Sequence, residues 1–339
     1  MKKMILFAML LAFALLVWPV QGNSQPVVNG GITTTMSEVP LYLAMEKGWL
    51  KEAGVEVKLH RFTASGFMLA PLSTGQLQLF TSGIGVGTYN AVARGLPLAL
   101  VAGTAYNMPA HDTQVLMLRT DLKEKMKTIG DLKGGKFATN ALSSSFNYAL
   151  GKTIEPAGLT LKDVKMVVIS VPDMVVAFRT KAIDFAYMFE PMGTLAEAQG
   201  VAIKWKKQSE TVSPYHQTAG IFFNRDWARN NPEQATGFML AWLKGTRAFY
   251  EAYKYGTNRK EIVDVAMKYL PIKDPALYEK MEWPFTNPNG YLDLKSIEDQ
   301  INWYYAQGQA THRLEVSQVV DHTFVEQAIK KLGEYKPRQ

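Results

Sequence analysis

The side chains that most often carry out catalysis or bind metals are sparse in this sequence of 339 residues. There is no cysteine, and the five histidines are widely separated, at His60, His111, His216, His312 and His322. None of these histidines forms a pair at the spacing of zinc ligands, and no nucleophile–histidine–acid set can be recognised. We therefore expect no metal site, no cofactor and no catalytic residues.

One glycine-rich run invites a phosphate-binding interpretation. Residues 82–87 read SGIGVG, but Thr88 stands where the third glycine of a dinucleotide-binding fingerprint would fall when counted from Gly83. We interpret these glycines as a turn, or as a place where the backbone approaches a ligand closely.

The first 22 residues have the pattern of a secretory signal peptide. Lys2 and Lys3 precede an apolar run that ends at Pro19, and Gly22 supplies a small residue for cleavage. An uncleaved membrane anchor is the alternative, but the apolar run is short for a bilayer span. Without cysteine the exported chain has neither disulfides nor a lipidation site. We expect a soluble periplasmic protein, cleaved near Gly22.

The charges give little indication of a macromolecular partner. The formal charge of +7 falls to +5 without Lys2 and Lys3, and the basic residues are scattered rather than grouped beside aromatic residues. This pattern argues against nucleic-acid binding. A mild positive excess suits either the attraction of an anionic ligand or simple solubility.

The apolar pattern alternates between strands and helices, and the same alternation starts again midway along the chain. A strand at 27–32, a helix from Val39 and an alternating strand over 55–62 open a first α/β unit. Gly48 is well placed to end that helix in a left-handed conformation. A second α/β unit follows, and the chain crosses between the two units near 113–119 and 217–224. Two lobes joined by two crossings predict a hinge with a cleft.

The opening segment also carries a family resemblance. Pro40, Tyr42, Ala44, Glu46-Lys47-Gly48, Leu50 and Gly54 follow a helix pattern of periplasmic solute-binding proteins of the taurine, sulfonate and nitrate type, a group that includes the NMT1/THI5-like domain. Further segments match in order: LSTGQLQLFTSG, AVARGLPLALVA, IGDLKGGKFAT, AGLTLKDV, AIDFAYMFEP and FNRDWARNNPE. Gln78 departs from the family, which usually has aspartate there. The resemblance covers roughly residues 27–235.

This resemblance implies an α/β protein with the two-lobed, type II periplasmic binding protein fold, in which a cleft separates two mixed-sheet lobes and the C-terminal region is helical. We expect a signal peptide at 1–22, a first lobe from 26–118 and 217–339, and a second lobe from 119–216. The implied function is the substrate-binding component of an ABC importer. A monomer would close over a small organic ligand, such as a sulfonate, carboxylate or pyrimidine-like molecule, and deliver it to the permease.

In such a fold the ligand lies between the lobes, at strand C-termini and helix N-termini. Projected onto this chain, the resemblance selects residues of the corresponding loops, each of which has helix capping or core packing as its alternative role. The expected ligand-binding residues are Thr34, Thr35, Met36, Ser37, Glu38, Ser65, Gly66, Phe67, Ser82, Gly83, Val86, Tyr106, Ser143, Ser144, Ser145, Phe146, Met188 and Glu190.

Glu190 bears most directly on ligand class. If its carboxylate contacts the ligand, it repels sulfonate or nitrate and favours an amine, an aminopyrimidine or a hydroxyl. Alternatively, Glu190 is a hinge residue paired with a lysine or arginine. Aromatic side chains offer a second indication, because they either line an apolar pocket or belong to the core. These are Tyr42, Phe67, Tyr106, Phe146 and Phe189.

Two other function classes share this scaffold. A THI5-like pyrimidine-precursor enzyme is the alternative, although its activity is associated with a cysteine-rich motif that this chain lacks. The effector domain of a LysR-type regulator would need an N-terminal helix-turn-helix in place of the signal peptide.

Overall fold

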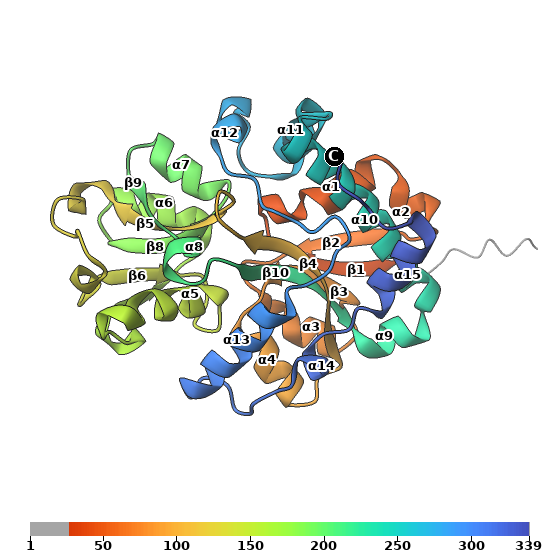
Figure 1. The fold of residues 1–339 in the computed structure, drawn as a ribbon, viewed down its shortest axis with the longest axis horizontal. Helices are drawn as coiled ribbons and strands as arrows, with labels where there is room; N and C mark the ends of the chain where they lie inside the picture. Colours follow the sequence, from red (N-terminus) through yellow and green to blue (C-terminus); the bar gives the residue numbers. More distant parts are fainter. Residues whose placement is uncertain (1–26, 339) are drawn as a thin grey trace, which may run out of the picture.

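The computed structural model describes residues 27–338, so the expected signal peptide at 1–22 lies outside the described residues. Two five-stranded sheets, each covered by helices, lie side by side along the long axis (Figure 1). Within the described range, no helix combines the length and hydropathy needed to cross a bilayer.

The first sheet has the strand order β2-β1-β3-β10-β4, with β1, β2 and β3 parallel and β10 antiparallel to both neighbours. Its strands are β1 (Val28–Ile32), β2 (Val57–Arg61), β3 (Leu79–Gly83), β4 (Leu98–Asn107) and β10 (His216–Asn224). The helices between them are α1 (Val39–Glu46), α2 (Trp49–Glu52), α3 (Leu69–Ser73) and α4 (Val86–Ala93). Every residue of β10 is buried, as expected for a central strand covered on both faces.

The second sheet repeats this plan with the order β7-β6-β8-β5-β9. Its strands are β5 (Gln114–Arg119), β6 (Lys136–Thr139), β7 (Lys165–Val168), β8 (Phe185–Phe189) and β9 (Ala202–Lys207). Its helices are α5 (Ser145–Ile154), α6 (Val171–Arg179), α7 (Met192–Ala198) and α8 (Gln208–Thr211). The two mixed sheets confirm the predicted fold class. Because β5 pairs only with β8 and β9, residues 114–118 join the second sheet here, whereas the sequence assigned them to the first lobe.

The C-terminal region is helical, as expected, and packs mainly on the first sheet (Figure 1). It comprises α9 (Arg225–Asn230), α10 (Pro232–Tyr255), α11 (Arg259–Tyr269), α12 (Pro275–Lys280), α13 (Leu294–Ala306), α14 (Val316–Val319) and α15 (Thr323–Leu332). Short 3-10 turns complete the fold: η1 (Met36–Glu38), η2 (Ser65–Met68), η3 (Thr120–Leu122), η4 (Ile129–Leu132), η5 (Glu155–Ala157) and η6 (Leu161–Asp163).

The turn into α1 shows how the sequence sets the local structure at the cleft. Thr35 and Glu38 form a reciprocal capping box at η1. Pro40 lies in the first turn of α1, where its missing N–H leaves no partner unsatisfied. Gly48 adopts the left-handed conformation (φ 72°) that the sequence predicted.

Three apolar clusters hold the molecule together. One lies between the first sheet and helices α1, α10 and α11, and another covers the opposite face of that sheet. The third forms the core of the second lobe. The second-lobe core is separate from the cluster around α10, whereas Tyr148 of α5 also packs into the cluster on the opposite face of the first sheet.

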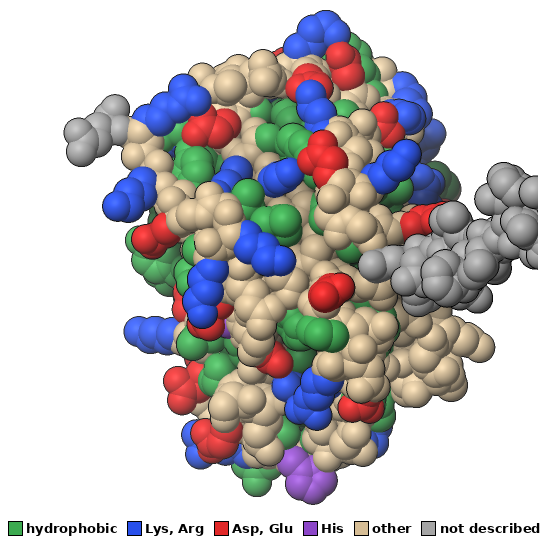
Figure 2. Space-filling model, turned by 90° about the vertical axis from the view of Figure 1, so that its right-hand side faces the viewer, with side chains coloured by type: hydrophobic (Ala, Val, Ile, Leu, Met, Phe, Trp, Pro, Cys, Tyr) green, Lys and Arg blue, Asp and Glu red, His purple; other side chains and the backbone are tan. Residues whose placement is uncertain are grey.

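On the face turned toward the viewer in Figure 2, basic and acidic side chains are interspersed, with apolar side chains between them. This mixture agrees with the scattered charges of the sequence. No large field of one sign is visible on the part of this face that the described residues form.

Candidate functional site

A cavity lies where the two lobes meet, with about 640 Å³ of space free of protein atoms, part of it open to solvent. Loops after β1, β2, β6 and β8 reach it, together with the C-terminal end of β3, the N-terminus of α5 and the ends of β4, β5 and β10 that face the crossings. Its lining residues are Thr33, Thr35, Met36, Ser37, Ala64, Ser65, Ser82, Gly83, Ala105, Thr113, Gln114, Asn140, Ser144, Ser145, Phe146, Phe189, Glu190, Thr218, Ala219 and Pro284.

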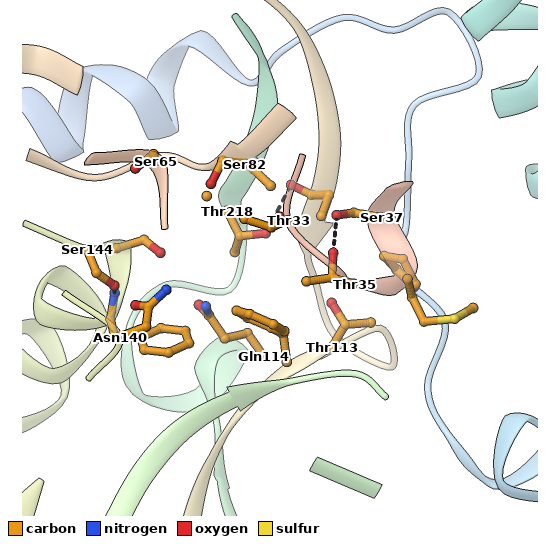
Figure 3. A pocket seen from close by; sticks show the side chains of 18 of the residues that line it. Thr33, Thr35, Ser37, Ser65, Ser82, Thr113, Gln114, Asn140, Ser144 and Thr218 are labelled. Atoms are coloured by element: carbon orange, nitrogen blue, oxygen red, sulfur yellow. Dashed lines mark hydrogen bonds between the residues drawn. The ribbon is translucent and has the colours of Figure 1, made fainter. Parts of the chain in front are cut away.

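The structure brings ten of the expected binding residues together around this cavity. They come from both lobes and are Thr35, Met36, Ser37, Ser65, Ser82, Gly83, Ser144, Ser145, Phe146 and Glu190. In Figure 3 the labelled polar side chains surround the same central space from opposite sides.

The other eight expected residues lie elsewhere. Glu38 is buried behind the lining, Val86 and Met188 belong to apolar cores, and Phe67 is exposed. Thr34 and Tyr106 border separate hollows. Ser143 and Gly66 contact each other without lining the cavity.

Several lining residues escaped the sequence prediction. Thr113, Gln114 and Thr218 stand at the crossings between the lobes, and Thr33 and Asn140 directly follow strands. The sequence did contain a signal for the residues at the crossings. Thr113-Gln114 and Gln217-Thr218 are polar pairs at the ends of otherwise apolar strands. The remaining missed positions are Ala64, Ala105, Phe189, Ala219 and Pro284, although Phe189 was among the aromatic candidates.

Glu38 organises the hydroxyl groups on the first-lobe side. Its carboxylate accepts hydrogen bonds from Thr33 Oγ1 (2.9 Å), from the Thr35 backbone N–H (3.0 Å) and from Thr35 Oγ1. Burial raises the pKa of Glu38 to about 7, even though these hydrogen bonds oppose the shift. Glu38 therefore sets the positions and proton directions of the lining threonines rather than facing the cavity itself.

Glu190 has a lysine partner, which is the alternative that the sequence left open. Its side chain is 2 % exposed, and Lys204 Nζ lies 2.7 Å from Oε1. The Thr194 backbone N–H and hydroxyl also donate to the carboxylate, at 3.0 and 2.9 Å. The backbone of Glu190 accepts a hydrogen bond from Met36 N (3.2 Å) across the cleft. Glu190 thus joins the lobes through its backbone while its charge is neutralised within the second lobe.

The lobes touch at further points beside the cavity. Asn140 Nδ2 donates to the Thr63 carbonyl at 2.9 Å. A Cβ added at Gly85 would lie 2.4 Å from the Ser143 carbonyl oxygen. The glycine-rich run at the end of β3 therefore allows close backbone contact between the lobes.

The aromatic candidates divide between cavity and core. Phe146 and Phe189 line the cavity, with ring centroids 5.5 Å apart. Tyr42 is buried and stacks on Tyr269 at 4.2 Å, and Tyr106 donates its hydroxyl to Asp293 at 2.8 Å. The cavity thus has two aromatic rings from the second lobe beside its many hydroxyl groups.

A second hollow adjoins the cavity and shares Thr33 and Phe189 with it. Arg61, Lys268 and Lys273 border this hollow, whereas the lining residues of the cavity include no lysine, arginine or histidine. Lys268 is paired with Glu46 at 2.8 Å. The basic character therefore belongs to the neighbouring hollow and not to the cavity itself.

The histidines have separate environments. His216 is buried against Tyr148 (ring centroids 5.0 Å apart), and burial lowers its pKa to about 4. His111 contacts Tyr253 edge-on, with centroids 5.0 Å apart. Across residues 27–338, no group of three or more histidine, aspartate or glutamate side chains is arranged to hold a metal ion.

Comparison with solved structures identifies the class of fold. The alkanesulfonate-binding protein SsuA of Xanthomonas axonopodis, bound to MOPS, superposes with a TM-score of 0.69 at 18% identity, covering 88% of this chain and 99% of that one. The periplasmic nitrate-binding protein NrtA of Synechocystis gives 0.71 at 15% identity, covering 91% and 89%. A desulfurization enzyme, DszB, gives 0.61 at 13% identity, covering 90% and 99%. The fold is that of the periplasmic binding proteins.

The family follows from the sequence itself. The NMT1/THI5-like family profile matches residues 36–252, and the chain belongs to this family. A putative binding protein of Brucella abortus is 25% identical over 276 residues, which is 80% of each chain.

Proposed function

We propose that this protein is the solute-binding component of an ABC import system, which closes over a small organic molecule and presents it to a membrane permease. The observation that carries this proposal is the cavity, whose lining comes from both lobes. A ligand that contacts both lobes stabilises their closed arrangement by its differential affinity for that state.

The similarity to known binding proteins supports the same proposal. The similar structures include sulfonate- and nitrate-binding proteins, and the Brucella relative is named as a binding protein. The cavity residues that we assign to ligand contact are the expected ones given above other than Glu190, together with Thr33, Thr113, Gln114, Asn140, Phe189 and Thr218.

An enzymatic function on this scaffold is the alternative, since DszB has a similar fold. The lining favours binding over catalysis. Glu190 is the ionisable residue among the lining residues, and its carboxylate is already bound to Lys204 and Thr194. A general acid or base needs an accessible proton-transfer group within reach of the substrate.

The test is to purify the protein without denaturation, release bound small molecules and identify them by mass spectrometry. The identified compound is then added back to ligand-stripped protein in a calorimeter. We expect one molecule per chain, recovered unchanged after incubation. Absence of any recovered or binding solute contradicts the proposed function, and chemical conversion of the compound supports the enzyme.

We also propose that the mature chain lies in the periplasm. This rests on Lys2-Lys3, the following apolar run and Gly22. N-terminal sequencing of protein from a periplasmic extract is expected to begin near Asn23. An intact Met1 in the membrane fraction contradicts this localisation.

A further inference from the structure

The polar groups around the cavity are sorted by hydrogen-bonding role. A hydroxyl group has a single proton to donate, and an ionised carboxylate, the form that Glu38 takes above about pH 7, only accepts. Thr33 and Thr35 both donate that proton to Glu38. Ser37 Oγ lies 2.7 Å from Thr35 Oγ1, so Ser37 must be the donor in that pair (Figure 3). All three hydroxyl groups on this side are thus left with lone pairs, and no free proton, for a ligand.

The threonines at the two crossings also donate their hydroxyl protons within the protein. Thr113 Oγ1 donates to Asn107 Oδ1 at 3.2 Å, and Thr218 Oγ1 donates to the Ala105 carbonyl at 3.1 Å. Both threonines therefore also present acceptor oxygens to the cavity.

Asn140 adds an acceptor that lacks a partner. Its Nδ2 donates to the Thr63 carbonyl, which fixes the orientation of the amide. Its Oδ1 is buried and has no hydrogen-bond partner among the described residues. A buried unsatisfied acceptor is costly, so a ligand N–H that reaches it gains free energy.

Other lining side chains can donate a hydrogen bond to a ligand. The hydroxyls of Ser65, Ser82 and Ser145 have no hydrogen-bond partner among the described residues, so they can either donate or accept. Ser144 Oγ accepts from the Phe146 backbone N–H at 3.0 Å, so its proton also remains free to donate. Gln114 Oε1 accepts from Gln208, which leaves the Gln114 Nε2 to donate. These groups suit one acceptor atom at another edge of the ligand.

We propose that the cavity selects a flat ligand whose polar head carries N–H donors and no negative charge, such as an amidine, an amide, an amine or a ring N–H. This inference deepens the proposed solute-binding function and rests on it. A negatively charged head meets the lone pairs of the committed hydroxyls, and no basic side chain among the lining residues compensates it. Phe146 and Phe189 suit an aromatic or heterocyclic body.

Glu38 is a positioning residue in this arrangement. It does not line the cavity, but it holds the protons of Thr33 and Thr35 away from the ligand. Replacing its carboxylate by a carboxamide introduces two N–H donors into the network, so some of the hydroxyl protons turn toward the cavity.

Calorimetry with four probes that share a phenyl ring, at a pH above 8 where Glu38 is ionised, tests the ligand class. Benzamidine and benzamide carry N–H donors, whereas benzoate and benzenesulfonate carry only acceptors and a negative charge. We expect ligand-stripped protein to bind each N–H probe at least tenfold more tightly than either anion. Equal or tighter binding of the anions overturns the proposed ligand class, and so does failure of all four probes to bind. Neither result touches the proposed function, which is judged by the solute recovered from native protein.

Three variants test the proposed cause. Glu38→Gln is expected to reduce the preference for benzamide over benzoate at least fivefold. Thr113→Val is expected to weaken benzamide binding several-fold and to leave benzoate binding unchanged. Thr246→Val is the matched control, because the buried Thr246 hydroxyl in α10 has no partner and does not line the cavity. An unchanged preference in both Glu38→Gln and Thr113→Val overturns the proposal, since a purely structural role alters both affinities together.

Discussion

Glu38 is buried and accepts hydrogen bonds from Thr33, Thr35 and Thr81, and this combination gives the protein a specific pH dependence. In the folded protein burial raises the pKa of Glu38 to about 7, from an ordinary value of 4.5. Between these two values the folded state binds more protons than the unfolded state. The stabilisation from this group is therefore complete below about pH 4.5 and is lost as the pH rises toward 7.

We predict that Glu38→Gln removes this loss, because glutamine does not titrate and can still complete the capping box. The difference in unfolding free energy between the two proteins should change by about 3 kcal/mol between pH 4.5 and pH 8. Denaturant unfolding at several pH values measures it. Burial lowers the pKa of His216, so its effect on the pH dependence of stability is opposite to that of Glu38. Because His216 is present in both proteins, its contribution cancels in the difference between them. If the unfolding free energies of the two proteins change in parallel with pH, the raised pKa of Glu38 is contradicted.

The Glu190–Lys204 pair belongs to the second lobe, and its energetics can be separated from ligand binding. Lys204→Met leaves the Glu190 carboxylate buried with only Thr194 as partner, so we predict a loss of roughly 3 kcal/mol in stability. The double variant Glu190→Gln/Lys204→Met should recover most of that loss. Chemical denaturation of the three proteins measures both effects.

Ligand affinity provides the control for this pair. Because both carboxylate oxygens already have partners, Glu190→Gln should change the affinity for the recovered solute less than threefold. A larger fall in affinity would show that the carboxylate contacts the ligand, which is one of the two roles that the sequence left open for Glu190.

Among the elements, α5 and α13 make a close helix contact between the second lobe and the C-terminal region. A Cβ at Gly151 of α5 would lie 2.1 Å from Trp303 Cζ2 of α13. Trp303 Nε1 also donates to Glu155 at 2.6 Å. Only glycine at position 151 allows the indole to lie against the helix backbone.

We predict that Gly151→Ala destabilises the protein by about 1–3 kcal/mol through overpacking, although alanine is the better helix former. Gly193→Ala is the matched control, because its nearest neighbours would be at 3.7 Å, an ordinary contact. That variant should be neutral or up to about 1 kcal/mol more stable. Thermal unfolding compares them, and similar melting temperatures for the two variants would contradict the close contact.

The sequence predicted the elements better than their allocation to lobes. Alternating apolar patterns and terminal glycines indicated most strands and helices, since these signals are local. The five buried residues from Gln114 to Leu118 carry no local sign of which sheet they join. That allocation depends on pairing with β8 and β9, which are distant in the sequence.

The candidate site was predictable as a set of loops, but the direction of single side chains was not. Thr35 and Glu38 both belong to the loop after β1, yet only Thr35 lines the cavity, because the capping box turns Glu38 inward. Thr113 and Thr218 were missed because their positions depend on where the two crossings meet in space.

In the molecule as a whole, the proposed ligand contacts both lobes at once. Contacts between lobes surround the cavity in this structure, including Met36 with Glu190 and Asn140 with Thr63. The second-lobe core is separate from the cluster around α10, so these contacts can break without unfolding either lobe. Ligand binding should therefore order segments that are far apart in the sequence.

Hydrogen exchange measured by mass spectrometry, with and without the solute recovered from native protein, tests this claim most directly. We predict that saturating solute slows exchange both in residues 33–38 of the first lobe and in residues 140–147 of the second. Helices α9 and α15, which lie away from the cleft, should exchange as before and serve as the internal control (Figure 1). Slower exchange in only one of the two lobes, or in neither, would contradict a ligand held between them.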